Sequence, residues 1–186
     1  MKRLTDLTLA LIAAMLLALP IALLALSIRL TSPGPALYWS DRMGRHNKIF
    51  KMPKFRSMRI DTPVVATHLL HQPELYLTPI GSFLRKSSMD ELPQLWSILK
   101  GDMSFVGPRP ALFNQEDLIG LRTEKGVHEL MPGLTGWAQV NGRDEIPISQ
   151  KVQFDLEYLK HQSLSFDMKI LWMTLLKVVA RDGVSH

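Results

Sequence analysis

Two adjacent carboxylates, Asp90 and Glu91, lie in a segment that also carries arginine and proline. The segment is Ser87–Pro110, SSMDELPQLWSILKGDMSFVGPRP. A carboxylate can act as a nucleophile or hold a divalent metal ion. Arginine presents a planar fork of N–H donors that binds phosphate oxygens in two places. These residue types together suit a site that moves a phosphoryl group.

Three arginines are the candidate phosphate ligands. Arg85 precedes Asp90 by five residues, Arg109 stands between two prolines, and Arg143 ends an Asn-Gly-Arg turn. The flanking prolines restrict the backbone on either side of Arg109 and should hold it rigid. Spacing by itself does not bring the three together, so their convergence on the carboxylates is an expectation.

A helix N-terminus is the simpler explanation of the same carboxylates. Ser88 followed three residues later by Glu91 matches the capping box. Acidic residues are common in a first turn because the helix N-terminus is electropositive. Pro93 is also tolerated there, where backbone N–H groups have no partner in the helix. A helix that begins near Met89 or Asp90 would explain the pair without chemistry, and both interpretations stay open on these residues alone.

The longest apolar run, Leu7–Leu26, is interrupted only by Thr8. About 20 residues that rise 1.5 Å each cover roughly the 30 Å hydrocarbon core of a bilayer. A signal peptide would have an apolar region of only about 7–15 residues and a cleavage site of small residues. This run is longer and lacks such a site, so it predicts a membrane segment that stays with the protein.

Pro20 near the middle of this run predicts a kink, because proline removes a helical hydrogen bond. Basic residues flank the run on both sides, with Lys2 and Arg3 before it and Arg29 after it. Basic flanks prefer the cytoplasmic side. A kinked spanning helix would place one flank on the wrong side, whereas a re-entrant helix hinged at Pro20 places both correctly. The charges favour the re-entrant helix, and the kinked span remains the alternative.

Composition restricts the rest of the protein only broadly. The chain has 186 residues, a net charge of +5 and no cysteine. This length suits one domain with an appendage. The charge fits nucleic acid, anionic lipid or phosphorylated substrates equally well. The lack of cysteine excludes disulfides, thiolate nucleophiles and cysteine metal sites.

Periodicity predicts the elements that must position the site. Residues 47–60 alternate cationic and apolar side chains, which predicts a short strand with a basic face that includes Lys54 and Arg56. Residues 131–143 are rich in Gly and Pro and predict loops with a short strand. Helical patterns cover 80–86, Asp90 to Gly101, 147–162 and 165–183. The last helix is amphipathic and either packs on the core or lies at a membrane interface. The fold class expected is α/β, with more helix than strand.

Four blocks of the chain are similar to those of the bacterial sugar transferases, the small monotopic phosphoglycosyl transferases. The blocks are FKMPKFRSM, MDELPQLWSILKGDMSFVGPRP, PGLTGWAQVNGR and MKILWMTLLKVV, and the resemblance covers nearly the whole chain. It implies a re-entrant membrane helix at 1–30. It also implies a compact catalytic domain at 31–186, with interfacial amphipathic helices, on the cytoplasmic face of the bacterial inner membrane. Pro20 matches the family's hinge, although Leu19 stands where serine is usual.

The resemblance also implies a reaction. A sugar-1-phosphate, with a preference for an N-acetylated amino sugar, would pass from a UDP-sugar to undecaprenyl phosphate with release of UMP. This would be the first membrane step of glycan assembly. Asp90 would attack the β-phosphorus and carry the phosphosugar, Glu91 would assist, and both would hold Mg²⁺. The expected substrate-binding residues are Lys54, Arg56, Arg85, Arg109 and Arg143.

Two other functions remain possible at this stage. One is a Mg²⁺-dependent pyrophosphatase that hydrolyses UDP-sugars without a lipid acceptor. The other is a membrane-attached scaffold in which the acidic pair only caps a helix. The expected partners are a UDP-sugar, polyprenyl phosphate and membrane lipid, and not nucleic acid. The sequence does not determine the sugar, the pathway or the oligomeric state.

Overall fold

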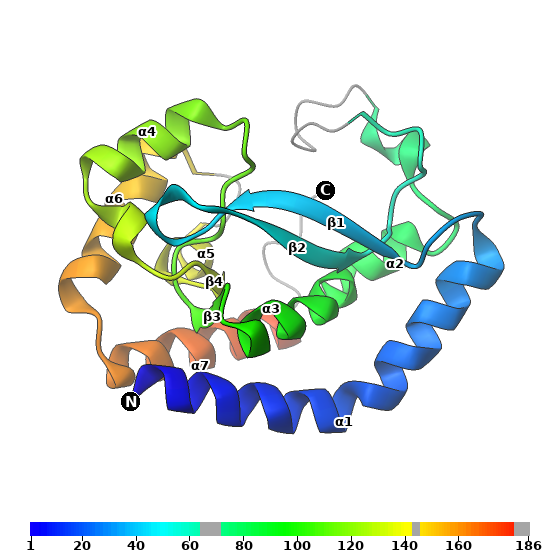
Figure 1. The fold of residues 1–186 in the computed structure, drawn as a ribbon, viewed down its shortest axis with the longest axis horizontal. Coiled ribbons are helices and arrows are strands. Elements are labelled where there is room, and N and C mark those ends of the chain that lie inside the picture. The colour runs from blue at the N-terminus through cyan, green and yellow to red at the C-terminus, as the bar shows by residue number, and fades with distance from the viewer. Residues whose placement is uncertain (64–71, 143–145, 181–186) are drawn as a thin grey trace.

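The structure is a computed structural model that describes residues 1–63, 72–142 and 146–180. Helices predominate in these residues, and the strands form two small two-stranded sheets (Figure 1). This arrangement confirms the predicted helix-rich α/β class. The helices are α1 Lys2–Thr31, α2 Gly81–Lys86, α3 Leu95–Lys100, α4 Glu116–Glu124, α5 Trp137–Val140, α6 Ile148–His161 and α7 Leu164–Ala180. Short 3₁₀ turns are η1 Arg45–Asn47, η3 Pro73–Tyr76, η4 Met89–Gln94 and η5 Val127–Glu129.

The first sheet is an antiparallel hairpin of β1, Leu37–Met43, and β2, Ile49–Phe55. β2 confirms the strand predicted within residues 47–60. Phe50, Met52 and Phe55 on β2 are buried. The alternation of buried apolar and exposed cationic residues fails at Lys54, whose side chain is only 17% exposed. Lys54 departs from the pattern because it faces a carboxylate of the candidate site, described below.

The second sheet pairs β3, Ser104–Val106, with β4, Gly133–Thr135, in parallel. Two glycines allow the backbones to approach closely beside this pair. A Cβ on Gly133 would lie 2.1 Å from the nitrogen of Gly107, and a Cβ on Gly107 would lie 2.2 Å from the carbonyl oxygen of Met131. Any larger residue would push the two backbones apart. The close approach fixes the point at which the Pro108–Pro110 segment leaves β3.

Helices cover both ends of the hairpin (Figure 1). α4 and α6 lie at one end, where Leu118 and Val152 pack with Ala111. α7 confirms the helix predicted at 165–183 over the residues that the structure describes, and its Ile170 is fully buried. Its outer face is also apolar, because Trp172 is 61% exposed and Leu175 is 53% exposed. α7 therefore both packs on the core and presents apolar side chains outward.

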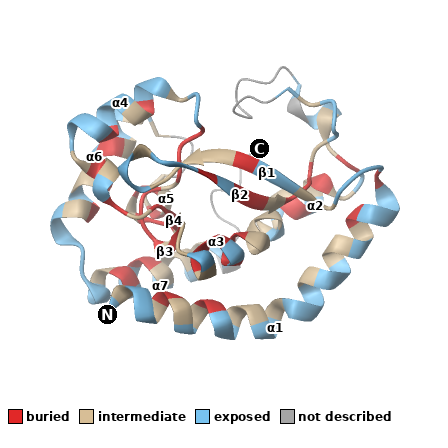
Figure 2. Cartoon of the chain, in the orientation of Figure 1, coloured by how far each residue is buried: buried red, intermediate tan, exposed pale blue. Residues whose placement is uncertain are grey.

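The long helix α1 is apolar and mostly exposed (Figure 2). Its most apolar 18-residue window has a mean hydropathy of 2.8, so its length and composition suit a membrane helix. Only Asp6, Ala10 and Ile28 are buried. The helix is continuous through Pro20, and Figure 1 shows that it bends toward β2 over its second half. The hinge at Pro20 stays a prediction, as does the domain division at residue 30.

Both ends of α1 are bonded to the same domain. Arg3 donates to the carbonyl oxygens of Ile98 and Leu99 at the end of α3. At the other end, Arg56 donates to both oxygens of Ser32, at 3.2 Å to the carbonyl and 2.8 Å to the hydroxyl. The exposed middle of the helix therefore lies between two anchored ends.

Candidate active site

The acidic pair lies on η4, directly before α3. The helix predicted to begin near Met89 or Asp90 and to end at Gly101 is confirmed at both ends, since η4 begins at Met89 and α3 stops at Gly101, which has a φ of 99°. Its first part, Met89–Gln94, is a 3₁₀ helix, and the α-helix begins at Leu95. The capping box is wrong, because Ser88 makes no side-chain cap. The side chain of Glu91 turns instead toward cations on other elements.

Glu91 forms two ion pairs. Its Oε1 accepts from Lys54 Nζ at 3.0 Å and from Arg109 Nη2 at 2.5 Å. Its Oε2 accepts from Arg109 Nη1 at 3.4 Å, and the side chain is only 13% exposed. Burial alone would raise the pKa of Glu91, but the charges and hydrogen bonds of Arg109 and Lys54 outweigh it and lower that pKa well below the ordinary value. Glu91 is therefore a fixed anion.

Asp90, which directly precedes Glu91, has different surroundings. Its carboxylate is partly exposed and accepts no hydrogen bond from any residue within the described ranges. Burial raises the pKa of Asp90, and the negative charge of Glu91 raises it further, against the charges of Lys54, Arg109 and Arg85. Neighbouring carboxylates with opposite pKa shifts are suited to different roles. Asp90 is the one whose oxygens can reach a ligand.

Arg85 completes the cation cluster around the pair. Its Nε donates to Ser57 Oγ at 3.1 Å and its Nη2 lies 3.0 Å from Met58 Sδ. Burial lowers the pKa of Arg85, and the charge of Asp90 opposes this shift; arginine nevertheless remains charged in proteins. The structure thus brings together five of the residues singled out in the sequence: Lys54, Arg85, Asp90, Glu91 and Arg109.

Arg56 is not part of this cluster. Arg56 is only 6% exposed, and its donors bind Ser32 and the carbonyl oxygen of Pro33. It therefore anchors the end of α1 and does not face the acidic pair. The predicted ligand Arg143 lies outside the described residues.

Sequence reasoning missed three charged residues near Arg109. Arg42 on β1 donates to the carbonyl oxygen of Pro110 at 3.2 Å. Arg122 on α4 donates to the carbonyl oxygen of Arg109 at 2.8 Å and also binds Asp155 on α6. No local pattern could have identified them, because each lies on an element far along the chain from the acidic pair.

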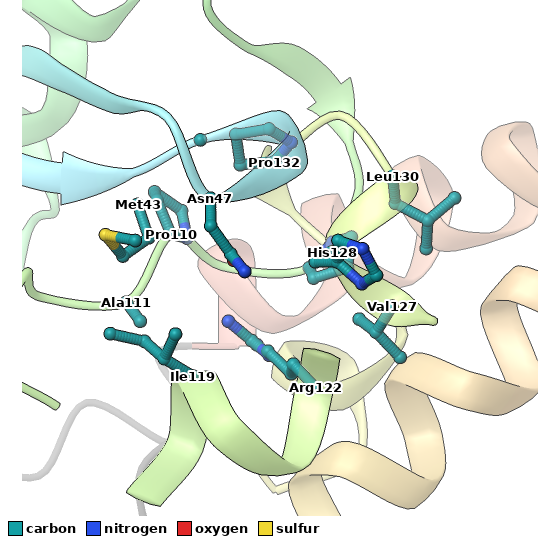
Figure 3. A pocket seen from close by; sticks show the side chains of 12 residues that line it. Met43, Asn47, Pro110, Ala111, Ile119, Arg122, Val127, His128, Leu130 and Pro132 are labelled. Atoms are coloured by element: carbon teal, nitrogen blue, oxygen red, sulfur yellow. The ribbon is translucent and has the colours of Figure 1, made fainter. Parts of the chain in front are cut away.

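A small pocket opens beside the Pro108–Pro110 segment (Figure 3). Its walls come from the turn after β1, from α4 and from η5. The polar side chains of Asn47, Arg122 and His128 point into it, as Figure 3 shows. Asn47 Nδ2 donates to Thr123 Oγ1 at 2.9 Å. This pocket borders the backbone that carries Arg109.

The carboxylate oxygens of Asp90 and Glu91 suit Mg²⁺ only when substrate phosphates complete its coordination. No group of three or more His, Asp or Glu side chains with metal-site geometry occurs in the part of the chain that the structure describes. Mg²⁺ is usually held by one or two carboxylates together with substrate phosphates and water. Asp90 has unbonded oxygens and Glu91 Oε2 has only the 3.4 Å bond from Arg109. These oxygens suit a metal that arrives with a diphosphate.

The fold and the site define a helix-rich domain with an apolar N-terminal helix and a carboxylate pair surrounded by cations. The model of the family described as bacterial sugar transferase matches residues 1–181. The chain belongs to the bacterial sugar transferase family. This membership confirms both the predicted resemblance and the prediction of an enzyme of the transferase class.

Individual relatives agree with the family match. The uncharacterized sugar transferase EpsL of Bacillus subtilis is 41% identical, over 100% of this chain and 91% of the relative. The UDP-glucose:undecaprenyl-phosphate glucose-1-phosphate transferase of Escherichia coli is 39% identical, over 95% of this chain but 40% of the relative. The undecaprenyl-phosphate galactose phosphotransferase of Salmonella typhimurium is 40% identical, over 81% of this chain and 34% of the relative. The chain thus spans well under half the length of the latter two.

Proposed function

We propose that the protein transfers a sugar-1-phosphate from a UDP-sugar to a polyprenyl phosphate, with Asp90 as the nucleophile. The division of roles within the acidic pair carries this proposal. Glu91 is bound by Lys54 and Arg109, whereas Asp90 accepts no hydrogen bond from the described residues. An attacking carboxylate needs free lone pairs, and Asp90 has them. The names of the E. coli and Salmonella relatives support undecaprenyl phosphate as the acceptor.

The reaction would run in two displacements. An oxygen of Asp90 attacks the β-phosphorus of the UDP-sugar, and the bond from that phosphorus to the bridging oxygen breaks, so UMP leaves. A phosphate oxygen of the polyprenyl phosphate then attacks the phosphosugar and releases the Asp90 carboxylate. Covalent catalysis divides one difficult transfer into two easier steps.

The cations have a role in both displacements. A carboxylate and a diphosphate repel each other, so positive charge must offset this repulsion before attack. Lys54, Arg109 and Arg85 all lower the pKa of Asp90 through their charges, Lys54 most strongly and Arg85 least. Lys54 and Arg109 also bind Glu91. Mg²⁺, held by Asp90 and Glu91 together with the diphosphate, would supply further neutralisation of phosphate charge. Arg143 remains a predicted ligand of the nucleotide.

The apolar surfaces support a site at the membrane. α1 exposes large apolar side chains along its middle while both of its ends are bonded to the domain. A helix held in this way suits entry and exit on one face of the bilayer, with the basic ends at the cytoplasmic headgroups. Trp172 on α7 extends the exposed apolar surface. One substrate is water-soluble and the other carries its phosphate at the interface, so a site at this level can reach both.

The experiment that tests this function is a UMP-release assay with the full chain in lipid nanodiscs. The donors are UDP-glucose, UDP-galactose and UDP-N-acetylated amino sugars, with Mg²⁺ and with or without undecaprenyl phosphate. We expect repeated turnover, with UMP and a lipid-linked sugar, only when lipid and metal are present, and the predicted amino sugar is tested against the hexoses in the same panel. Without lipid, the first displacement should release at most about one UMP per protein molecule, because the phosphosugar stays on Asp90. Multiple-turnover UMP release without lipid would indicate the pyrophosphatase, and no release from any donor would indicate the scaffold.

A further inference from the structure

We propose that Arg122 is a positioning residue that acts on the reaction through the backbone of Arg109. The inference rests on the proposed function, because Arg109 matters only if Glu91 and Asp90 carry out the transfer. Among the described residues, Arg122 makes no hydrogen bond or ion pair with Asp90 or Glu91, since its donors bind Asp155 and the carbonyl oxygen of Arg109. Its influence passes through one hydrogen bond, from its Nη1 to the carbonyl oxygen of Arg109 at 2.8 Å.

The segment that carries Arg109 cannot position itself as an ordinary strand. Pro108 and Pro110 have no N–H groups, so the segment cannot form a continuous ladder of backbone donors. Among the described residues, backbone N–H groups bond to the carbonyls of this segment only at its two ends. Gly133 N donates to the carbonyl oxygen of Pro108 at 2.9 Å, and Met43 N donates to that of Ala111 at 2.9 Å.

Arginine side chains supply the two donors between these ends. Arg122 binds the carbonyl oxygen of Arg109, and Arg42 binds that of Pro110 at 3.2 Å. Four consecutive carbonyls are therefore held by four donors from three elements. The backbone at Arg109 is fixed in this way, so the direction in which its side chain leaves toward Glu91 is fixed as well.

Arg122 is itself held firmly by a buried partner. Its Nε and Nη2 donate to Asp155 Oδ2 at 2.9 and 2.6 Å. The side chain of Arg122 is 9% exposed and that of Asp155 is 1% exposed. Because the guanidinium is planar and two of its nitrogens are bound to Asp155, the remaining nitrogen has one direction left, toward the carbonyl of Arg109.

A purely structural ion pair is the competing explanation. Buried ion pairs contribute little net stability compared with apolar residues, so a role in packing alone would need only the contact between α4 and α6. A packing role does not explain why the third nitrogen of Arg122, Nη1, donates to the carbonyl oxygen of Arg109. Lysine separates the two explanations, because its single nitrogen can pair with Asp155 but cannot also hold the planar bond to Arg109.

The test is a double-mutant cycle in the UMP-release assay. We expect Arg122→Lys to lower kcat/KM about 10- to 100-fold, as loss of a residue that orients a site residue does. We expect Arg109→Met to lower it about 100- to 1,000-fold, as loss of a charged donor does. If Arg122 acts through Arg109, the double variant is no worse than Arg109→Met alone. Effects that multiply would overturn the proposal.

A second readout is independent of activity. Hydrogen–deuterium exchange of the peptide around residues 106–112 should be faster in Arg122→Lys than in the unaltered protein. Leu156→Ala is the control, because it removes an apolar contact of α6 one residue from Asp155. Leu156 packs with the cluster that contains Val106, so the comparison uses the amides of Arg109, Ala111 and Leu112, and the control should leave their exchange unchanged. Equal exchange in Arg122→Lys and the unaltered protein would overturn the proposal, even if no donor released UMP and the proposed function had failed.

Discussion

Arg109 donates to both carboxylate oxygens of Glu91, at 2.5 and 3.4 Å, across 18 residues of sequence. This contact decides which of two adjacent carboxylates is available for chemistry. It holds Glu91 as an anion, and the charge of Glu91 in turn raises the pKa of Asp90. Arg109, together with Lys54, thus divides the pair into a fixed member and a free member.

The two carboxylates should respond differently to amide substitution. Asp90→Asn removes the nucleophile, so we expect a loss of about 10⁴-fold or more in UMP release. Glu91→Gln leaves the nucleophile in place and should cost only about 10- to 100-fold, as loss of a supporting partner does. Intact-mass spectrometry should detect a phosphosugar adduct on the unaltered protein and on Glu91→Gln, and none on Asp90→Asn. Full activity in Asp90→Asn would refute covalent catalysis at this residue.

The stability that Glu91 contributes should depend on pH in a defined direction. Its pKa is lower in the folded state than the ordinary 4.5 of the unfolded chain. The contribution is therefore complete above about pH 4.5, and it is lost as pH falls toward the folded-state pKa, because the unfolded chain binds the proton first. Glu91→Gln should lower the free energy of unfolding by about 2 kcal/mol at pH 7, and by progressively less below pH 4.5. Chemical denaturation in detergent with EDTA measures this, and an equal difference at pH 7 and pH 3.5 would contradict it.

The elements were largely predictable because their signals are local. The alternation around Phe50 and Met52 indicates a strand, and Gly101 marks the end of α3. The candidate cations Arg85 and Arg109 also lie close to the acidic pair in the sequence. The structure confirms these two signals because each is local. The glycine signal depends on the backbone conformation that ends a helix, and the strand signal depends on the alternation of buried and exposed side chains.

The features that failed depend on contacts between distant segments. The capping box at Ser88 failed because two cations from other elements bind Glu91 more strongly than a turn can. The resemblance implied that Arg56 binds substrate, but its guanidinium binds Ser32 at the end of α1. Arg122 was overlooked because nothing in α4 indicates that Arg109 lies beside it. Only the tertiary structure supplies this information.

The polar anchor at the start of α1 should contribute measurably to stability. Asp6 is 6% exposed, and its Oδ1 accepts from Ser104 Oγ at 3.0 Å and from Phe105 N at 3.1 Å. Asp6→Ala leaves both donors unpaired, so we expect the free energy of unfolding to fall by about 1–3 kcal/mol. Thr8→Ala is the control, because Thr8 is exposed and bonds only within α1, to the carbonyl of Leu4. Equal effects of the two substitutions would show that Asp6 does not anchor the helix.

The two ends of α1 should be accessible from the same side of the membrane. The chain has no cysteine, so a single introduced cysteine is the only thiol that can react. Leu4→Cys and Thr31→Cys lie near the two ends, which are bonded to the same domain through Arg3 and Arg56. In inverted membrane vesicles, whose cytoplasmic face is outward, an impermeant maleimide should label both. Met15→Cys, in the exposed apolar middle of the helix, should stay unlabelled until detergent is added. Labelling of one end in inverted vesicles and of the other only in right-side-out vesicles would establish a spanning helix and refute the re-entrant one.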